Sequence, residues 1–137
     1  MSPILVLACY RFYAIIKTSM KWLIEYYRDA KGKEPVADFI DALPLRVRPK
    51  VFMVISMLVE YGVLLSEPFT KQIRGKIREL RIKDSQEQVR VFYFTFTGRR
   101  FILLHAFIKK TDKTPEGEIL IAEKRMKDFI ERFGGES

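Results

Sequence analysis

The stretch that decides the fold is VRVFYFTFTGRRFILLHAFI, residues 89–108. Two runs rich in aromatic and β-branched residues, Val89–Phe96 and Arg100–Lys109, flank the connection Thr97-Gly98-Arg99. A short connection that contains glycine is typical of a hairpin between antiparallel strands. Because both alternating positions of each run are largely apolar, both faces of these strands should be covered. The stretch therefore predicts the two central strands of a sheet.

The same pattern extends in both directions from this hairpin. A third strand-like run, Ile77–Lys83, precedes it and is separated from it by the polar residues Asp84–Gln88, which predicts a consecutive antiparallel meander. After the hairpin, Thr114-Pro115 should begin a last helix, and Gly134-Gly135 should end it. The apolar residues of this helix fall on one stripe: Ile119, Ala122, Met126, Phe129, Ile130 and Phe133.

The first half of the chain predicts one strand and two helices. Trp22–Tyr27 is typical of a strand, and Pro35 is well placed as the first residue of a short helix that Leu43-Pro44 breaks. A second, amphipathic helix should end at Gly62, and Val63–Gly75 is expected to be irregular. Its apolar residues recur at helical spacing: Val47, Val51, Val54, Ile55 and Leu58. The predicted order is β-α-α-β-β-β-α, a single α+β domain with helices packed on an antiparallel meander sheet.

Residues 1–19 form an N-terminal extension to this domain. Their apolar run lacks the basic leader and the cleavage site of a secretory signal, and it is shorter than the roughly 20 apolar residues that span a bilayer. Met20 opens a sequence typical of a natural first strand, so we hypothesise that translation begins there. The expected organisation is an extension over residues 1–19 and one domain over residues 20–137, with no membrane partner and a cytoplasmic location.

The net charge of +8 is concentrated in one segment. Lys71–Lys113 contains twelve Lys and Arg residues against four Asp and Glu residues, so it carries the whole excess, and the charges of the remaining residues cancel. Such a field favours a polyanionic partner, because neutralised phosphates release counterions. The alternative is a solvated basic face that only keeps the protein soluble.

Several kinds of site are excluded by residue type. Cys9 is the single cysteine and His105 the single histidine, so neither an internal disulfide nor a zinc site of Cys and His ligands can form. No glycine-rich phosphate loop precedes a helix, and no Gly-x-Ser-x-Gly motif is present. We expect no metal and no cofactor.

The remaining candidates for chemistry are cationic. Arg81 and Arg90 lie on adjacent predicted strands, and Lys109, Lys110 and Lys113 lie between the next strand and the last helix. RNA cleavage requires the 2′-OH to lose a proton, the charge on the pentavalent phosphate to be stabilised, and the leaving 5′-oxygen to gain a proton. Cations perform the second task directly. The alternative is that these are ordinary exposed residues of strands, as structural charge clusters are common.

Four runs of residues together resemble those of the RelE/ParE toxin superfamily, within its phage-derived HigB-like branch. They are RELRI at 78–82, VRVFYF at 89–94, LLHAFIKKT at 103–111 and KTP at 113–115 before a helix, and the resemblance covers about Met20 to Phe133. It implies the same order of elements and a metal-free, ribosome-dependent endoribonuclease that cuts mRNA in the decoding site. It also implies a cognate antitoxin, commonly with a helix-turn-helix domain.

The resemblance singles out four residues. Arg81 occupies the position of the basic residue proposed as general base in RelE-type toxins, Arg90 matches a phosphate-binding arginine, and Lys109 and Lys110 match the basic pair that supplies the proposed general acid. Two departures matter: arginine, with a pKa above about 12, does not readily accept a proton, and the last helix lacks a tyrosine found in some relatives.

The general base is therefore open. Lys110, Lys113 and His105 are candidates, although a histidine in mid-strand is more often a hydrogen-bonded core residue; catalysis could also rest mainly on positioning and charge stabilisation. We expect five further basic residues to hold the RNA backbone: Lys71, Arg74, Lys76, Arg78 and Lys83. The alternative functions are a ParE-like gyrase-inhibiting toxin and a non-catalytic nucleic-acid-binding phage protein.

Overall fold

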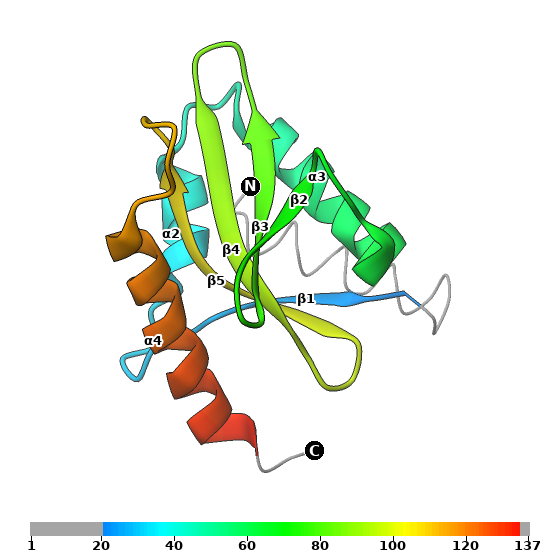
Figure 1. Ribbon diagram of the computed structural model, residues 1–137, viewed down its shortest axis with the longest axis vertical. Coiled ribbons are helices and arrows are strands. Elements are labelled where there is room, and N and C mark those ends of the chain that lie inside the picture. Colours follow the sequence, from blue (N-terminus) through cyan, green and yellow to red (C-terminus); the bar gives the residue numbers. More distant parts are fainter. Residues whose placement is uncertain (1–20, 135–137) are drawn as a thin grey trace.

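The central hairpin lies in the middle of a mixed sheet. The computed structural model describes residues 21–134, and in them five strands form one sheet in the order β1-β5-β4-β3-β2 (Figure 1). The strands are β1 (Leu23–Tyr26), β2 (Thr70–Arg74), β3 (Ile77–Lys83), β4 (Gln88–Phe96) and β5 (Arg100–Ile108). The helices are α2 (Pro35–Ala42), α3 (Arg48–Tyr61) and α4 (Glu116–Phe133), with a 3₁₀ turn η1 (Gly62–Leu64) after α3. The predicted α+β class is confirmed.

The order of elements differs from the prediction by one strand. Thr70–Arg74, expected to be irregular, is β2, which pairs antiparallel with β3 at the edge of the sheet. The order over these residues is therefore β-α-α-β-β-β-β-α. Only Thr70 in this strand is buried, and Lys71, Gln72 and Arg74 are exposed, so β2 lacks the apolar alternation by which a strand is recognised.

The other edge strand also departs from the predicted antiparallel sheet. β3, β4 and β5 form the predicted antiparallel meander, but β1 pairs parallel with β5, with Leu23 opposite Arg100 and Tyr26 opposite Leu103. Two parallel strands need a long crossover connection, and the helices α2 and α3 form part of the connection between β1 and the meander.

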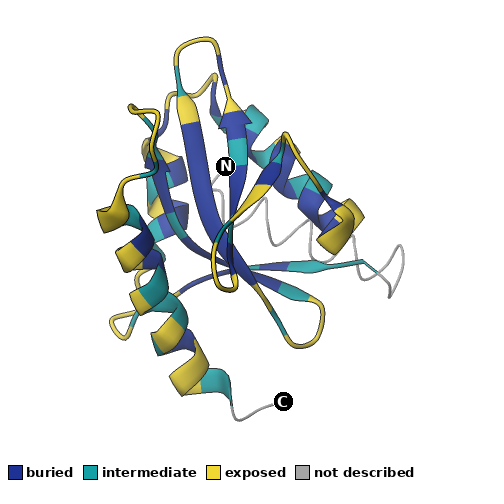
Figure 2. Cartoon of the chain, viewed as in Figure 1, coloured by how far each residue is buried: buried dark blue, intermediate teal, exposed yellow. Residues whose placement is uncertain are grey.

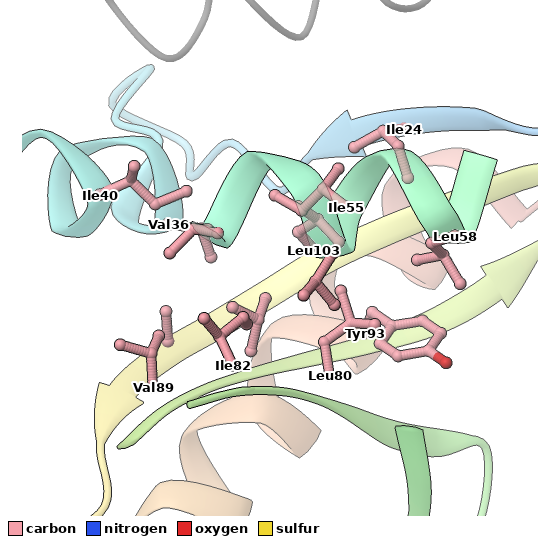
Figure 3. Close-up of a cluster of buried hydrophobic side chains, with 14 of the residues drawn as sticks. Ile24, Val36, Ile40, Ile55, Leu58, Leu80, Ile82, Val89, Tyr93 and Leu103 are labelled. Carbon is pink, nitrogen blue, oxygen red and sulfur yellow. The ribbon is translucent and has the colours of Figure 1, made fainter. Parts of the chain in front are cut away.

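Helices cover both faces of the sheet. α2 and α3 pack on one face, where Val36, Ile55, Leu58, Leu80 and Leu103 belong to one buried cluster (Figure 3). α4 packs on the other face, over a second cluster that includes Phe92, Phe94, Leu104 and Phe129. Figure 2 shows β4 and β5 buried over most of their length. The prediction that these strands are covered on both faces is confirmed.

A β-bulge changes which residues of β5 face α4. Phe92 is opposite His105, whereas Tyr93 is opposite Leu103, so Leu104 is an extra residue on β5. Leu104 belongs to the cluster under α4, and His105 contacts Glu118 of α4. The bulge thus turns two consecutive side chains towards the same helix.

A buried carboxylate fastens the β3–β4 hairpin to the start of α3. Asp84 is 8% exposed and pairs with Lys50 at 2.8 Å and with Arg46 at 3.2 Å. The hydrogen bond from Lys50 is the main reason that the pKa of Asp84 falls to about 2. This contact holds one end of the meander against the helical layer.

The expected extension over residues 1–19 and the hypothesised start at Met20 lie outside the described residues. Within residues 21–134, no helix has the length and apolar character needed to cross a membrane.

The junction between α3 and η1 yields a stability prediction. Gly62 has φ +58° and ψ −132°, a conformation open essentially to glycine alone, and an added Cβ would collide with the indole of Trp22. Trp22 is itself stacked on Phe101 at 4.6 Å between ring centroids. We expect Gly62→Ala to lower the free energy of unfolding in urea by about 2–3 kcal/mol or more.

Gly117→Ala is the matched control, because Gly117 lies in α4 with no atom within 4 Å of an added Cβ. It should leave stability unchanged or raise it by about 0.5 kcal/mol. Equal stability of the Gly62→Ala variant and the wild-type protein would contradict the described junction.

Candidate active site

Three strands bring the predicted basic residues to one end of the sheet. Arg81 on β3 lies directly opposite Arg90 on β4, and Arg90 lies opposite Phe107 on β5. The backbone N–H of Lys109 donates to the carbonyl of Gln88 at 2.7 Å, which continues the pairing of β4 and β5. This is the upper end of the sheet in Figure 1, where β3 ends and β4 begins. Arg81 and Arg90 are therefore adjacent, and Lys109 lies two residue pairs away from Arg90.

Strand alternation places both arginines on the face of the sheet that α4 packs against. Ile77 on β3 and Phe92 on β4 belong to the cluster under α4. Because side chains alternate along a strand, Glu79 and Arg81 share the face of Ile77, and Arg90 shares the face of Phe92. The side chain of Arg81 is 28% exposed, so solvent reaches this part of the face.

Between the two arginines lies a carboxylate that the sequence did not single out. Glu79 is 0% exposed. Its Oε1 accepts a hydrogen bond from Nε of Arg81 at 2.8 Å and lies 3.6 Å from Nε of Arg90. The sequence did contain a signal for this contact. Glu79 lies two residues before Arg81, and on a strand the side chains of such residues face the same side of the sheet.

Arg90 is the more buried of the two arginines, at 7% exposed. Its guanidinium donates to the side-chain oxygen of Gln88 at 3.2 Å and to the carbonyl of Val89 at 3.4 Å. Burial lowers the pKa of Arg90, Glu79 opposes that effect, and the neighbouring charge of Arg81 adds to it. The two guanidinium groups thus place two positive charges close together, with the one negative charge of Glu79 between them.

The three lysines lie in the connection between β5 and α4. Lys109 is half-buried, while Lys110 and Lys113 are exposed, and the structure records no side-chain partner for them within residues 21–134. The hydroxyl of Thr111 donates to the carbonyl of Lys113 at 2.8 Å, which shapes the connection. These lysines are available to an incoming polyanion.

His105 is a hydrogen-bonded residue under α4, as the core interpretation expects. Its Nε2 lies 3.3 Å from Glu118, and Arg125 donates to its Nδ1 at 3.2 Å. Because arginine only donates, Nδ1 must accept, and Nε2–H then donates to the carboxylate. Burial holds the pKa of His105 below its ordinary value, although Glu118 opposes this effect. Both ring nitrogens are therefore engaged.

The five residues expected to hold RNA do not form one surface. Arg74 is engaged in a bidentate pair with Glu116 of α4, at 2.7 and 2.8 Å. Arg78 lies on the opposite face from Arg81, where it lines a pocket of about 510 Å³ together with Gly62 and Tyr93. The other three are exposed: Lys71 on β2, which lines the same pocket as Arg78, Lys76 in the β2–β3 turn and Lys83 at the end of β3.

No three His, Cys, Asp or Glu side chains among the described residues gather closely enough to hold a metal ion. The candidate functional groups at this end of the sheet are guanidinium and ammonium groups, which bind anions, and the carboxylates of Glu79 and Asp84 beside them are each paired with two cations.

The sequence pattern of the phage-derived protein Gp49-like family (DUF891) matches residues 38–127. The chain belongs to this family. The match runs from α2 into α4 and includes Glu79, Arg81, Arg90, Lys109 and Lys110. It confirms the resemblance to the phage-derived, HigB-like branch of the RelE toxin superfamily.

The Gp49-like chain is also similar to curated proteins of Mycobacterium tuberculosis. It is 39% identical over 64 residues to the probable endoribonuclease HigB1 of strain CDC 1551 / Oshkosh and, equally, to that of strain ATCC 25618 / H37Rv. The aligned residues make up 47% of this chain and 50% of each relative, so the chain spans half the length of the curated relatives it matches.

The half-buried His105 generates a prediction about pH. The folded protein keeps the pKa of His105 below its unfolded value of about 6.5, so the resulting stability is present above that pH and is lost as the pH falls. The free energy of unfolding should fall between pH 7.5 and 5.5, and by less in His105→Gln. Asp84 and Asp128 do not interfere, because their pKa values are lowered and they titrate at more acidic pH. Parallel pH curves for both proteins would exclude this role of His105.

Proposed function

We propose that this Gp49-like protein is the toxin of a toxin–antitoxin pair and an endoribonuclease that cuts mRNA on translating ribosomes. The observation that carries the proposal is the facing pair Arg81 and Arg90, with Lys109 and Lys110 beside it, in a chain similar to a probable endoribonuclease. We further propose that its partners are the ribosome, mRNA and an antitoxin with a helix-turn-helix domain, and that it acts in the cytoplasm.

Arg81 and Arg90 would grip the scissile phosphate. Nε of Arg81 is bound to Glu79, and the structure gives its two terminal NH₂ groups no partner within residues 21–134, so they are available to phosphate oxygens. A guanidinium matches two such oxygens in one plane. As the 2′-OH attacks, the added negative charge on the phosphorus would be stabilised by these groups, which are already in place.

Lys109 and Lys110 would act at the leaving group. An ammonium group can donate the proton that the departing 5′-oxygen needs, or it can stabilise the charge on that oxygen. Attack by the neighbouring 2′-OH requires no metal, so this chemistry fits side chains of this type.

Removal of the 2′-OH proton is assigned to no single strong base. Arg81 is an arginine and is bound to Glu79, and both nitrogens of His105 are engaged by Glu118 and Arg125. We propose that catalysis rests mainly on positioning and charge stabilisation, with the ribosome orienting the RNA. Lys110 and Lys113, which are exposed, remain the candidates for assistance.

The test is to map mRNA 5′ ends produced by the purified protein, with translating ribosomes present and absent. New ends should appear in the presence of ribosomes, and Arg81→Gln should reduce the cleavage rate by about 10²-fold, the typical cost of removing one donor to transition-state charge. Lys124→Gln is the matched control, because it removes the same charge from an exposed position of α4 and should cleave normally.

Two results would contradict the proposal. The first is full cleavage by Arg81→Gln. The second is growth arrest by the wild-type protein without any new mRNA 5′ ends, which would favour a protein target such as gyrase.

A further inference from the structure

Glu79 has an unusual position for a carboxylate. It is completely buried, both of its recorded partners are arginines, and both contacts are made by Oε1. Its Oε2 is buried without a hydrogen-bond partner among the described residues, as is Nε of Arg90. Burial of a charged group with spare hydrogen-bonding capacity is costly, so it demands a specific reason.

The reason lies in the pairing of the strands. Arg81 and Arg90 are directly opposite one another, and like charges in that arrangement repel. Arg90 is also almost fully buried, where an uncompensated charge is strongly destabilising. One carboxylate between them reduces the local charge from +2 to +1 and makes the pair compatible with a folded sheet.

Glu79 does not reach the substrate itself. Its Oε2 has almost no solvent-accessible surface, and its Oε1 is occupied by Arg81, so an RNA 2′-OH has no route to either oxygen. Whatever Glu79 contributes to function must therefore act through the two guanidinium groups. Because the contact to Arg81 is made by Nε, the terminal NH₂ groups of that side chain are left without a hydrogen-bond partner among residues 21–134.

We propose that Glu79 is the positioning residue of a phosphate-binding site formed by Arg81 and Arg90. It fixes the direction of the Arg81 guanidinium by a hydrogen bond and offsets the charge of Arg90 at 3.6 Å. The three groups together carry one net positive charge, which a single phosphodiester neutralises. The assignment to RNA rests on the proposed function, whereas the anion site and the role of Glu79 in it are tested without RNA.

The first test measures thermal unfolding of the full chain in sodium phosphate and in sodium chloride of equal ionic strength. Phosphate should raise the melting temperature of the wild-type protein. We call this rise in melting temperature, relative to chloride, the phosphate gain. In Glu79→Gln, which has the same shape but no charge, the phosphate gain should be larger by about 3 °C or more, because phosphate then replaces the missing negative charge. Glu79→Asp keeps the charge but withdraws it from both arginines by one methylene, so its phosphate gain should lie between that of the wild-type protein and that of Glu79→Gln.

Asp84→Asn is the matched control. Asp84 is also a buried carboxylate that pairs with two cations, but its partners Arg46 and Lys50 are 46% and 44% exposed and remain solvated without it. Its phosphate gain should equal that of the wild-type protein. A gain in Glu79→Gln no larger than in Asp84→Asn overturns the proposal. If Glu79→Gln is unfolded in both salts, Glu79→Asp decides: a gain above the wild-type value supports the proposal, and an unchanged gain overturns it.

The second test separates binding from catalysis in the ribosome-dependent cleavage assay, with rates normalised to folded protein. Glu79→Gln should lower kcat by about 10-fold or more while KM stays equal or falls, because the site is more positive but its donors are no longer held in place. A merely structural role would leave both constants of the folded fraction unchanged. If the wild-type protein cuts no RNA, the proposed function fails, and the phosphate comparison still decides the role of Glu79.

Discussion

The carboxylate of Glu79, buried between Arg81 and Arg90, is the contact on which the rest of the site depends. Two guanidiniums on facing positions of a sheet repel, and water cannot screen the charge of a buried one. The negative charge therefore has to come from the same sheet. Burying the carboxylate of Glu79 costs free energy. The large apolar clusters on both faces of the sheet offset this cost and leave the strands little freedom to separate.

The sheet topology explains why the charges meet at this end. The hairpin between β3 and β4 fixes Arg81 opposite Arg90, and Asp84 holds that hairpin to α3 through Lys50 and Arg46. On β5, the bulge at Leu104 turns His105 under α4, where Glu118 and Arg125 bind it. The single histidine thus supports the docking of α4, and under the proposed function the cations at the end of the sheet bind phosphate.

Much of the fold could be predicted because its signals are local. Two apolar runs rich in aromatic residues and the connection Thr97-Gly98-Arg99 predicted the central hairpin, and Gly62 predicted the end of α3. β2 was missed because an exposed edge strand has no apolar pattern. Ile130, placed on the apolar stripe of α4, is 37% exposed, since the period identifies the stripe of a helix but not how far the sheet beneath it extends.

The site was harder to predict than the fold. Glu79 was missed because an acid is usually exposed, and only the pairing of the strands shows it to be buried. The division of Arg74, Arg78 and Arg81 among different surroundings likewise depends on register, which sequence does not fix.

The central claim is that the pair held by Glu79 is where the protein grips the scissile phosphate of mRNA. The most direct measurement is an electron cryomicroscopy structure of the protein on a ribosome whose mRNA carries a single 2′-deoxynucleotide at the cleavage position, so that the RNA binds but is not cut. The scissile phosphate is expected within hydrogen-bond distance of the guanidinium of Arg81, with Arg90 beside it and Glu79 still between the two arginines. A structure in which the mRNA contacts another surface, such as the pocket lined by Arg78, and leaves Arg81 without a phosphate contact would contradict the claim.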